Sequence, residues 1–239
     1  MTLAIFDLDE TLIRGDSCSL FCEFLVAQGL VGEEFIAEDR RMMDLYNAEK
    51  LVLSDYVGFF IEPLQHLTVD QVDALMPGFV ERFISPCIYP EAIVKLAELK
   101  AEGYRPVIVS ATAEFIVKAV ANTLGVSDVL AIQLEQEQDF YTGQIEGVPT
   151  FREGKVTRLQ SWLVEQQESI EGAHFYSDSI NDLPLLEQVD FPVATNPDGL
   201  LLVVASERNW PVLNWTAPDH NDSNPTPEQH FTRQELTHV

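Results

Sequence analysis

Four short segments carry the side chains that phosphoryl transfer requires. They are Asp7-Leu8-Asp9-Glu10-Thr11, Ser110-Ala111-Thr112, Lys155 and Asp178-Ser179-Ile180-Asn181-Asp182. A carboxylate can attack phosphorus at neutral pH when a divalent cation screens its repulsion from the phosphate. A hydroxyl and a lysine can hold the phosphate oxygens while other carboxylates bind the cation. Together the segments predict a phosphoryl-transfer centre, provided that the fold brings them to one place.

The first segment predicts the two catalytic carboxylates. We expect Asp7 to be the nucleophile that attacks phosphorus. Asp9 returns to the same side of an extended chain, where it can protonate the leaving oxygen and then deprotonate the attacking water. Thr11 or the adjacent backbone amides would position the phosphate. Taken alone, an acidic pair after a strand is also typical of a helix N-cap or a turn.

The other three segments predict the phosphate and metal ligands. Ser110 and the amides near Ala111 lie at the expected N-terminus of a helix, which favours anion binding. Lys155 would stabilise negative charge on the non-bridging oxygens. Asp178 is an oxygen ligand of the kind that Mg²⁺ prefers, and Asp182 would be a further ligand or hold Lys155 in place. Alone, Ser110 could be a cap and Lys155 a surface charge, so the prediction depends on the whole set.

The elements that position these segments alternate between strands and helices. Apolar runs predict strands at 3–6, 106–109, 129–133, 173–177 and 191–194, and helical patterns lie at 91–102, 113–124, 155–167, 181–187 and 197–204. A hairpin is expected over 135–148, with Thr142-Gly143 in its middle. The alternation predicts an α/β fold with a doubly wound, Rossmann-like parallel sheet, in which ligands bind at the carboxyl ends of the strands. We therefore expect the polar segments to meet at that edge.

The chain is expected to divide into a core, an insertion and a tail. Residues 16–85 predict about four helices between the first strand and the rest, so they form an inserted helical cap domain. Residues 1–15 and 86–216 would form the catalytic core. Residues 217–239 are polar and predict a flexible C-terminal tail, although His220, His230 and His238 leave a metal-binding tail as an alternative.

The composition restricts the partners. The chain has 239 residues, with 14 Lys+Arg against 39 Asp+Glu and a formal net charge of −25. Such a field repels nucleic acid and anionic membranes, and it requires any phosphate site to be locally positive. Its three cysteines predict no disulfide framework, and the sequence predicts neither a signal peptide nor a membrane span. We expect a cytoplasmic protein that acts on a small-molecule phosphate ester; the oligomeric state stays open.

The four segments resemble the motifs of the haloacid dehalogenase-like phosphohydrolase superfamily. The first matches its DxDxT motif, Ser110 and Lys155 match the second and third, and the last matches the DxxND form of the fourth. The resemblance implies a Mg²⁺-dependent phosphomonoesterase that works through an aspartyl-phosphate. It implies that Mg²⁺ is held by the side chains of Asp7 and Asp178 and the carbonyl of Asp9, and phosphate by Ser110 and Lys155. Asn181 and Asp182 would support the site, with Asp182 orienting Lys155.

The position of the helical insertion resembles the branch that includes phosphoserine phosphatase and bacterial histidinol-phosphatase-like proteins. The run from Tyr176 to Leu186 is closer to the second group, because phosphoserine phosphatases usually have GDGxND here. We therefore expect histidinol phosphate or a similar amino-alcohol phosphate, with phosphoserine as the alternative. The cap residues that could contact the leaving group are Arg14, Glu23, Arg40, Arg41, Met42, Met43 and Tyr46. A cap acid such as Glu23 would pair with a substrate ammonium, and an arginine with a carboxylate.

Other functions use the same residue types. A phosphotransferase would pass the phosphoryl group from the aspartate to an acceptor alcohol. A non-catalytic signalling module would hold the phospho-aspartate, but the long insertion and Asp9 oppose it. A catalytically inactive binding module is disfavoured because the set is complete.

Overall fold

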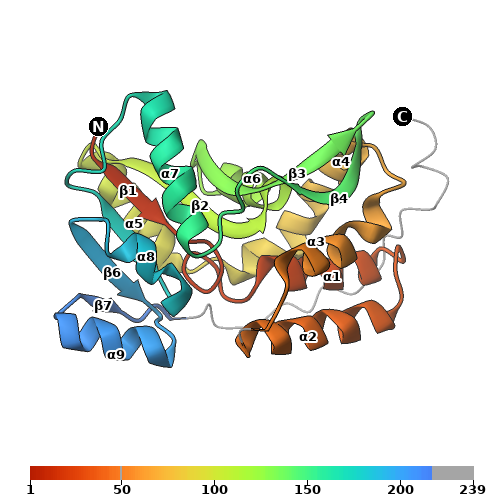
Figure 1. Ribbon diagram of the computed structural model, residues 1–239, viewed down its shortest axis with the longest axis horizontal. Helices are drawn as coiled ribbons and strands as arrows, with labels where there is room; N and C mark the ends of the chain where they lie inside the picture. The colour runs from red at the N-terminus through yellow and green to blue at the C-terminus, as the bar shows by residue number, and fades with distance from the viewer. Residues whose placement is uncertain (49, 217–239) are drawn as a thin grey trace.

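The computed structural model describes residues 1–48 and 50–216, and its centre is a seven-stranded sheet (Figure 1). The strand order is β4-β3-β2-β1-β5-β6-β7. All neighbouring pairs are parallel except β3 with β4, which is antiparallel. The strands are β1 (Leu3–Phe6), β2 (Arg105–Ala113), β3 (Asp128–Glu137), β4 (Phe140–Glu146), β5 (His174–Ser177), β6 (Phe191–Thr195) and β7 (Val212–Leu213). The doubly wound α/β fold expected from the sequence is confirmed.

Helices cover both faces of the sheet. Along β1, Ala4 and Phe6 pack with one group of buried residues, and Leu3 and Ile5 pack with the other, because successive side chains point to opposite faces. One face is covered by α5 (Pro90–Ala101) and α6 (Glu114–Thr123). The other face is covered by α7 (Glu153–Gln166), α8 (Leu183–Leu186) and α9 (Gly199–Arg208), with the short helix η4 (Ile180–Asp182) before α8.

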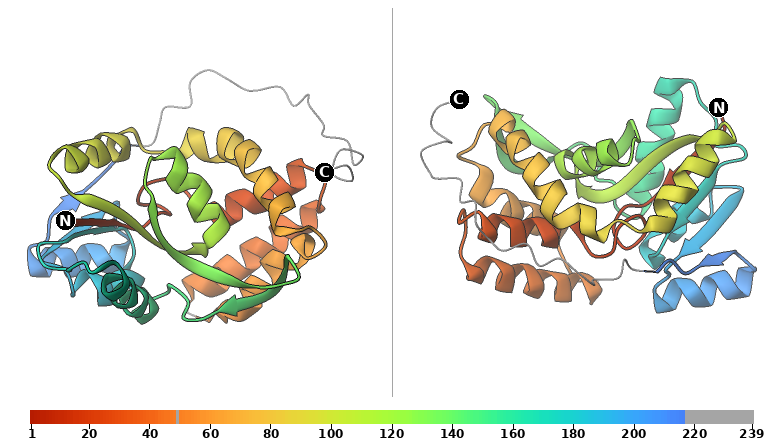
Figure 2. Two further views of the ribbon diagram at one scale, coloured as in Figure 1. Left: turned by 90° about the horizontal axis from the view of Figure 1, so that it is seen from above. Right: turned by 180° about the vertical axis from the view of Figure 1, so that it is seen from behind.

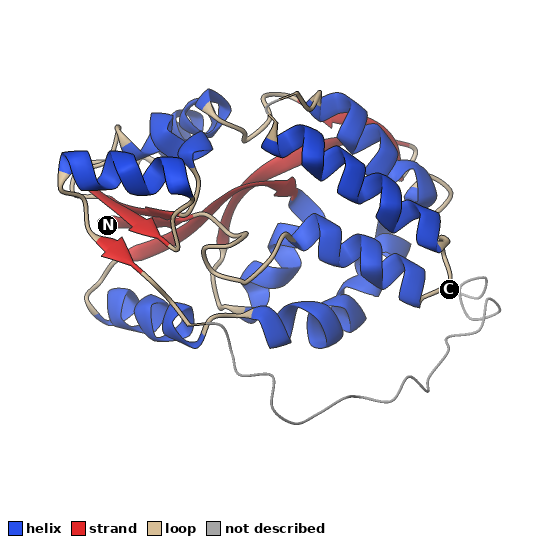
Figure 3. Cartoon of the chain, turned by 90° about the horizontal axis from the view of Figure 1, so that it is seen from below, coloured by secondary structure: helices blue, strands red, loops and turns tan. Residues whose placement is uncertain are grey.

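The segment between β1 and β2 is helical up to α5. It contains α1 (Ser17–Ala27), α2 (Glu33–Asn47), α3 (Leu53–Ile61), η1 (Glu62–Leu64), α4 (Val69–Phe79), η2 (Val80–Ile84) and η3 (Ser85–Cys87). These helices gather at one end of the molecule, and β6, β7 and α9 lie at the other (Figure 2). Figure 3 shows from below that helices lie on both sides of the sheet. We call the helices from α1 to α4 the cap helices.

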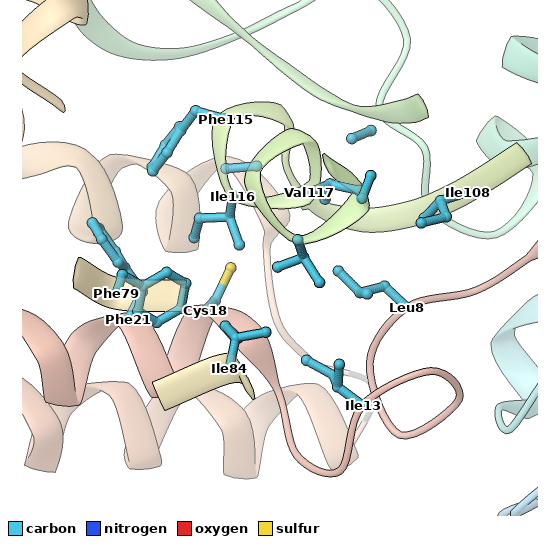
Figure 4. Packing of buried hydrophobic residues seen from close by; sticks show 14 of the residues in the cluster. Leu8, Ile13, Cys18, Phe21, Phe79, Ile84, Ile108, Phe115, Ile116 and Val117 are labelled. Carbon is cyan, nitrogen blue, oxygen red and sulfur yellow. The ribbon is translucent and has the colours of Figure 1, made fainter. Parts of the chain in front are cut away.

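The cap helices and the sheet share one hydrophobic core. The ring of Phe21, on α1, lies 5.7 Å from that of Phe60 and 5.0 Å from that of Phe79, both on other cap helices, measured between centroids. It also meets the ring of Phe115, on α6, edge-on at 5.7 Å. Figure 4 shows Phe21, Phe79 and Phe115 within the same packed group as Ile108 of the sheet. Because this packing is continuous, the cap helices are attached to the core by buried apolar surface as well as by the chain.

The β3–β4 hairpin differs from the expectation. Its turn lies at Gln138 and Asp139, both with positive φ, and not at Thr142-Gly143. The first arm is an extension of β3, which therefore runs longer than the predicted strand. The backbone amide of Val69 donates to the carbonyl of Asp139, so the turn is joined to the start of α4. The turn of the hairpin thus lies nearer to the N-terminus than predicted, and it contacts the start of α4. Local sequence does not encode such a contact between distant segments.

The remaining expectations concern the C-terminal tail, membrane spans and the cysteines. The predicted tail at 217–239 lies outside the described residues. Within residues 1–48 and 50–216, no helix has both the length and the apolar character needed to cross a bilayer. Cys18, Cys22 and Cys87 are free cysteines and all three are buried.

Candidate active site

A cavity of about 590 Å³ lies where the carboxyl ends of the central strands face the cap helices. It is lined by Asp7, Asp9, Glu10, Asp16, Cys18, Met43, Tyr46, Leu51, Leu53, Tyr56, Ala111, Thr112, Phe151, Lys155, Asp178, Ser179, Ile180, Asn181, Asp182, Asp198, Gly199 and Leu200. All four polar segments singled out in the sequence therefore contribute to one cavity. A larger cavity of about 740 Å³, between α4, α6 and the hairpin, is lined by none of them.

Lys155 joins two carboxylates at the floor of this cavity. Its Nζ donates to Oδ1 of Asp7 and to Oδ2 of Asp182, each at 2.8 Å. The lysine is 3% exposed, and burial opposes its charge, but Asp182 and Asp7 hold its pKa above the ordinary value. The hydroxyl of Ser177, at the end of β5, also donates to Asp182 at 2.7 Å. The sequence left two roles for Asp182, a further metal ligand or a residue that holds Lys155. Its contact with the Nζ of Lys155 matches the second role.

Asp9 is fixed from two sides. The backbone amide of Ser17, the first residue of α1, donates to Oδ1 at 2.8 Å, and the hydroxyl of Thr112 donates to Oδ2 at 2.7 Å. Asp16 precedes Ser17 and caps α1 by accepting from the amide of Ser19 at 2.8 Å. The start of the first cap helix therefore holds the carboxylate expected to act as acid and base.

Thr11 is placed differently from the expectation. Its side chain is fully buried, does not line the cavity, and donates to Oδ1 of Asp178 at 3.1 Å. The expectation that the Thr11 side chain positions the phosphate is therefore wrong for this structure. Because its hydroxyl binds a carboxylate oxygen, Thr11 orients Asp178, and the first and fourth segments are tied together by this bond.

The second segment lies in an irregular part of β2. Val109 is aligned with Leu130 and Ala113 with Ile132, so β2 carries extra residues against β3 between these positions. The strand was expected to stop at Val109. The irregularity places Ala111 and Thr112 on the cavity, whereas Ser110 is fully buried, and its Oγ accepts from the amide of Thr112 at 3.2 Å.

The fourth segment is held by a series of short polar contacts. The hydroxyl of Ser179 accepts from the backbone amide of Asn181 at 3.2 Å, and the carboxylate of Asp198 accepts from the backbone amide of Ile180 at 2.7 Å. The side chain of Asn181 accepts from Nε of Arg152 at 3.0 Å and donates to the hydroxyl of Tyr46 at 3.1 Å. Since Tyr46 belongs to α2, Asn181 connects the catalytic edge of the sheet with the cap helices.

The carboxylates of the cavity are difficult to ionise without a cation. Burial raises the pKa of Asp7 to about 7 although Lys155 lowers it, and the charges of Asp182 and Asp9 add to the rise. Burial and then the charge of Asp16 raise the pKa of Asp9 to about 7. Burial, Asp7 and Asp182 raise the pKa of Asp178 well above its usual range. A bound cation would favour the ionised carboxylates, because its charge offsets both the cost of burial and their mutual repulsion.

The donor set fits Mg²⁺. Among the described residues, no group of three or more His, Cys, Asp or Glu side chains is arranged as a metal cage. The set implied by the family resemblance needs only two such side chains, Asp7 and Asp178, together with the carbonyl of Asp9. Mg²⁺ is commonly bound by one or two carboxylates while it keeps several waters. The two carboxylates line one cavity, and the charge of Asp7 adds to the effect of burial in raising the pKa of Asp178, so the residues present suit a hard divalent cation.

The cap side of the cavity was predicted only in part. Met43 and Tyr46 line it, but Arg14, Glu23 and Arg40 do not. Glu23 and Arg40 are exposed on the surface, and the amide of Arg14 donates to the carbonyl of Cys87, on η3. The helical pattern predicts the spacing of residues along each helix but not which face of the helix lies against the cavity. The expectation that these three side chains contact the leaving group is therefore wrong for this structure.

Arg41 and Met42 also lie away from the cavity. Arg41 is exposed and pairs with Glu38 at 2.6 Å, and Met42 is buried in the hydrophobic core. Several lining residues, among them Asp16 and Tyr56, were missed by the sequence reasoning. Asp16 stands just before a helical pattern, which is the usual signal of an N-cap and could have placed it beside the first motif. Nothing in the local sequence distinguishes Tyr56 from its aromatic neighbours.

Comparison with known proteins agrees with this geometry. The family model for haloacid dehalogenase-like hydrolases matches residues 4–187. A histidinol-phosphatase of Neisseria meningitidis is 37% identical over 218 residues, which cover 89% of this chain and 98% of that protein. A protein of unknown function from Bordetella pertussis has a similar structure, with a TM-score of 0.81, 35% identity and coverage of 89% of this chain and 99% of that one.

Substrate-bound phosphoserine phosphatase shares the fold, with a TM-score of 0.63, 19% identity and coverage of 89% of this chain and 92% of that chain. The family model spans every motif singled out in the sequence, from the DxDxT segment to the DxxND segment. The resemblance expected from those motifs is confirmed, and the chain therefore belongs to the haloacid dehalogenase-like hydrolase family.

Proposed function

We propose that this protein is a Mg²⁺-dependent phosphomonoesterase that works through an aspartyl-phosphate on Asp7. The observation that carries the proposal is the contact of Lys155 with both Asp7 and Asp182 on the floor of a cavity that Asp9 also lines. A nucleophile, an acid–base group and a fixed positive charge then face the same volume. This is the arrangement that in-line attack on a phosphate ester requires.

The proposed reaction has two steps. Asp7 attacks phosphorus, and Asp9 donates its proton to the oxygen of the leaving alcohol. A water molecule then attacks the phosphorus of the aspartyl-phosphate, and Asp9 takes the proton from that water. When bound by Asp7, Asp178 and the carbonyl of Asp9, Mg²⁺ would screen the negative charges of carboxylate and phosphate from each other.

The other residues bind and orient the groups that react. The Nζ of Lys155 would face the non-bridging phosphate oxygens while Asp182 keeps it in position. In the second segment, the backbone amide of Ala111, which lines the cavity, would donate to the same oxygens. Ser110 is buried away from the cavity and accepts from the backbone amide of Thr112, so it would support this segment rather than bind the phosphate directly. Thr112 and the amide of Ser17 keep Asp9 in place for the proton transfers.

We propose histidinol phosphate, or a similar amino-alcohol phosphate, as the substrate. The similarity to the Neisseria histidinol-phosphatase supports this choice. In the described part of the chain, Lys155 is the only basic side chain that lines the cavity, and it is already paired with carboxylates. A substrate carboxylate, as in phosphoserine, would lack a free partner there. Asp16, which lines the cavity and whose pKa is raised by burial to about 6, would instead face the substrate ammonium.

Release of inorganic phosphate from a panel of esters tests the proposal. The panel contains histidinol phosphate, phosphoserine, a sugar phosphate and nitrophenyl phosphate, each with Mg²⁺ and with EDTA. We expect Mg²⁺-dependent release with histidinol phosphate highest in kcat/KM. A preference for phosphoserine would support the alternative substrate, and faster turnover with added acceptor alcohols would support a phosphotransferase. No release by folded protein with any ester would contradict the proposal.

A further inference from the structure

A buried carboxylate–tyrosine pair lies in the cap helices next to the cavity. The hydroxyl of Tyr56, on α3, donates to Oδ1 of Asp39, on α2, at 2.9 Å. Asp39 is 3% exposed and does not line the cavity, whereas Tyr56 does. Burying a carboxylate is unfavourable unless it has donors, and the proposed chemistry does not use Asp39. The pair therefore calls for an explanation other than catalysis.

The pair fixes the hydrogen-bonding role of the Tyr56 hydroxyl. A phenol has one proton and can also accept. Because the proton of Tyr56 is directed to Asp39, the oxygen of Tyr56 faces any ligand as an acceptor. The ring of Tyr56 packs against those of Phe59 and Phe60, with centroids 6.3 and 6.0 Å away, so its position is restricted.

The hydroxyl of Tyr46 has the opposite role. Arg152 can only donate, and its Nε donates to the side-chain oxygen of Asn181 at 3.0 Å. This contact assigns the amide nitrogen of Asn181 to the side that faces Tyr46, where it donates to the tyrosine hydroxyl at 3.1 Å. The oxygen of Tyr46 is thereby used as an acceptor, and its own proton is left for another partner in the cavity.

We propose that Tyr46 and Tyr56 form a specificity subsite for the imidazole ring of the leaving group, with Tyr46 as donor and Tyr56 as acceptor. A neutral imidazole presents one N–H and one bare nitrogen, which is the complement of this pair. Both tyrosines line the cavity on its cap side together with Met43, Leu51 and Leu53, which offer apolar contacts to the ring faces. Asp39 is a positioning residue that acts through Tyr56. The inference depends on the proposed phosphatase function.

The test compares two esters that differ only in the ring. Histidinol phosphate and the phosphate ester of phenylalaninol share the ammonium and the phosphate, but the phenyl ring has no hydrogen-bonding nitrogen. We expect the wild-type protein to prefer the imidazole ester by at least about tenfold in kcat/KM, because a site built to hydrogen-bond a substrate leaves polar groups unpaired with the analogue. Tyr56→Phe should lower this preference about fivefold through KM, with a smaller change in kcat/KM for the phenylalaninol ester and for nitrophenyl phosphate.

Two further variants separate recognition from structure. Asp39→Asn keeps an oxygen that accepts from Tyr56 and should retain most of the preference, whereas Asp39→Ala should lose it to the same extent as Tyr56→Phe. Tyr104→Phe is the matched control, since its hydroxyl lies 3.4 Å from His174 and away from the cavity. The proposed subsite is wrong if Tyr56→Phe leaves the preference unchanged. It is also wrong if the variant lowers kcat/KM equally for histidinol phosphate, the phenylalaninol ester and nitrophenyl phosphate. Absence of Mg²⁺-dependent hydrolysis of every ester by wild-type protein would instead contradict the proposed function.

Discussion

The hydroxyl of Tyr46, on α2, accepts a hydrogen bond of 3.1 Å from the side-chain amide of Asn181, which lies 135 residues later on η4. Among the polar contacts around the cavity, this one joins a cap helix to the segment that carries Asp178 and Asp182. The ring of Tyr46 also lies 5.9 Å from that of Phe151, between centroids. The cap-side wall of the cavity is therefore positioned directly by the catalytic edge of the sheet.

Asn181→Ala should loosen this connection. We expect KM for the preferred ester to rise about fivefold, which is the effect of one neutral hydrogen bond, with a smaller change in kcat. Hydrogen exchange of the α2 amides should become faster in the variant. Asn122→Ala, at the larger cavity away from the site, serves as the control. An unchanged KM together with unchanged exchange in α2 would show that this contact does not hold the cap helices.

Asp7→Asn and Asp9→Asn should affect different steps. Asp7→Asn removes the nucleophile, so we expect neither turnover nor a phosphoenzyme. Asp9→Asn keeps the nucleophile but cannot transfer protons, so turnover should fall by about 10²–10⁴-fold, and the aspartyl-phosphate should accumulate with esters of good leaving groups. Acid quench and mass spectrometry of the intact chain measure the added phosphoryl group. Turnover by Asp7→Asn near the wild-type rate would disprove the assignment of the nucleophile.

Lys155→Met should cost stability as well as activity. It leaves Asp7 and Asp182 buried without their common cation, and removal of one partner from a buried ion pair typically costs about 3–5 kcal/mol. Adding Asp182→Asn removes one of the uncompensated charges, so the double variant should regain part of the free energy of unfolding. Activity should stay lost in both. Urea denaturation in EDTA measures the difference, and additive losses in the double variant would refute the coupling.

The stability gained from Mg²⁺ should increase with pH. The pKa values of Asp7 and Asp9 are about 7 in the folded metal-free protein against an ordinary value of 3.8, chiefly because of burial. Between these values the folded protein holds protons that the unfolded chain has released, so stability in EDTA falls as pH rises. Because Mg²⁺ binds the ionised carboxylates, the difference in Tm between Mg²⁺ and EDTA should be larger near pH 8 than near about pH 5.5. An equal difference at both values would contradict this linkage.

Gly154 keeps the start of α7 close to the preceding loop. A Cβ on Gly154 would collide with the backbone carbonyl oxygen of Pro149, so Gly154→Ala should lower the free energy of unfolding by about 1–3 kcal/mol and also lower kcat, because Lys155 is the next residue. Gly58→Ala is the matched control. Apart from the neighbouring backbone of its own helix, no atom lies within 4 Å of the added Cβ, and Gly58 is inside α3, so we expect a gain of about 0.5–1 kcal/mol.

The sequence by itself determined the chemistry and the edge of the sheet where it occurs. Asp7, Asp9 and Asp178 follow apolar runs that predict buried strands, and parallel strands place their carboxyl ends together. The types of these residues, and the presence of a helical insertion after the first strand, are properties of the chain. They therefore needed no knowledge of contacts between distant residues.

The tertiary structure decided which side chains hold the reactive groups. Thr11 binds Asp178, Thr112 binds Asp9, and Asn181 binds Tyr46, and each pair is separated by more than a hundred positions along the chain. Such contacts depend on the strand order, on the irregularity in β2 and on which helix face packs against the core. Periodicity gives the faces of one element but not the partner of that face, and for this reason Glu23 and Arg40 were assigned to the cavity while Asp16 and Tyr56 were missed.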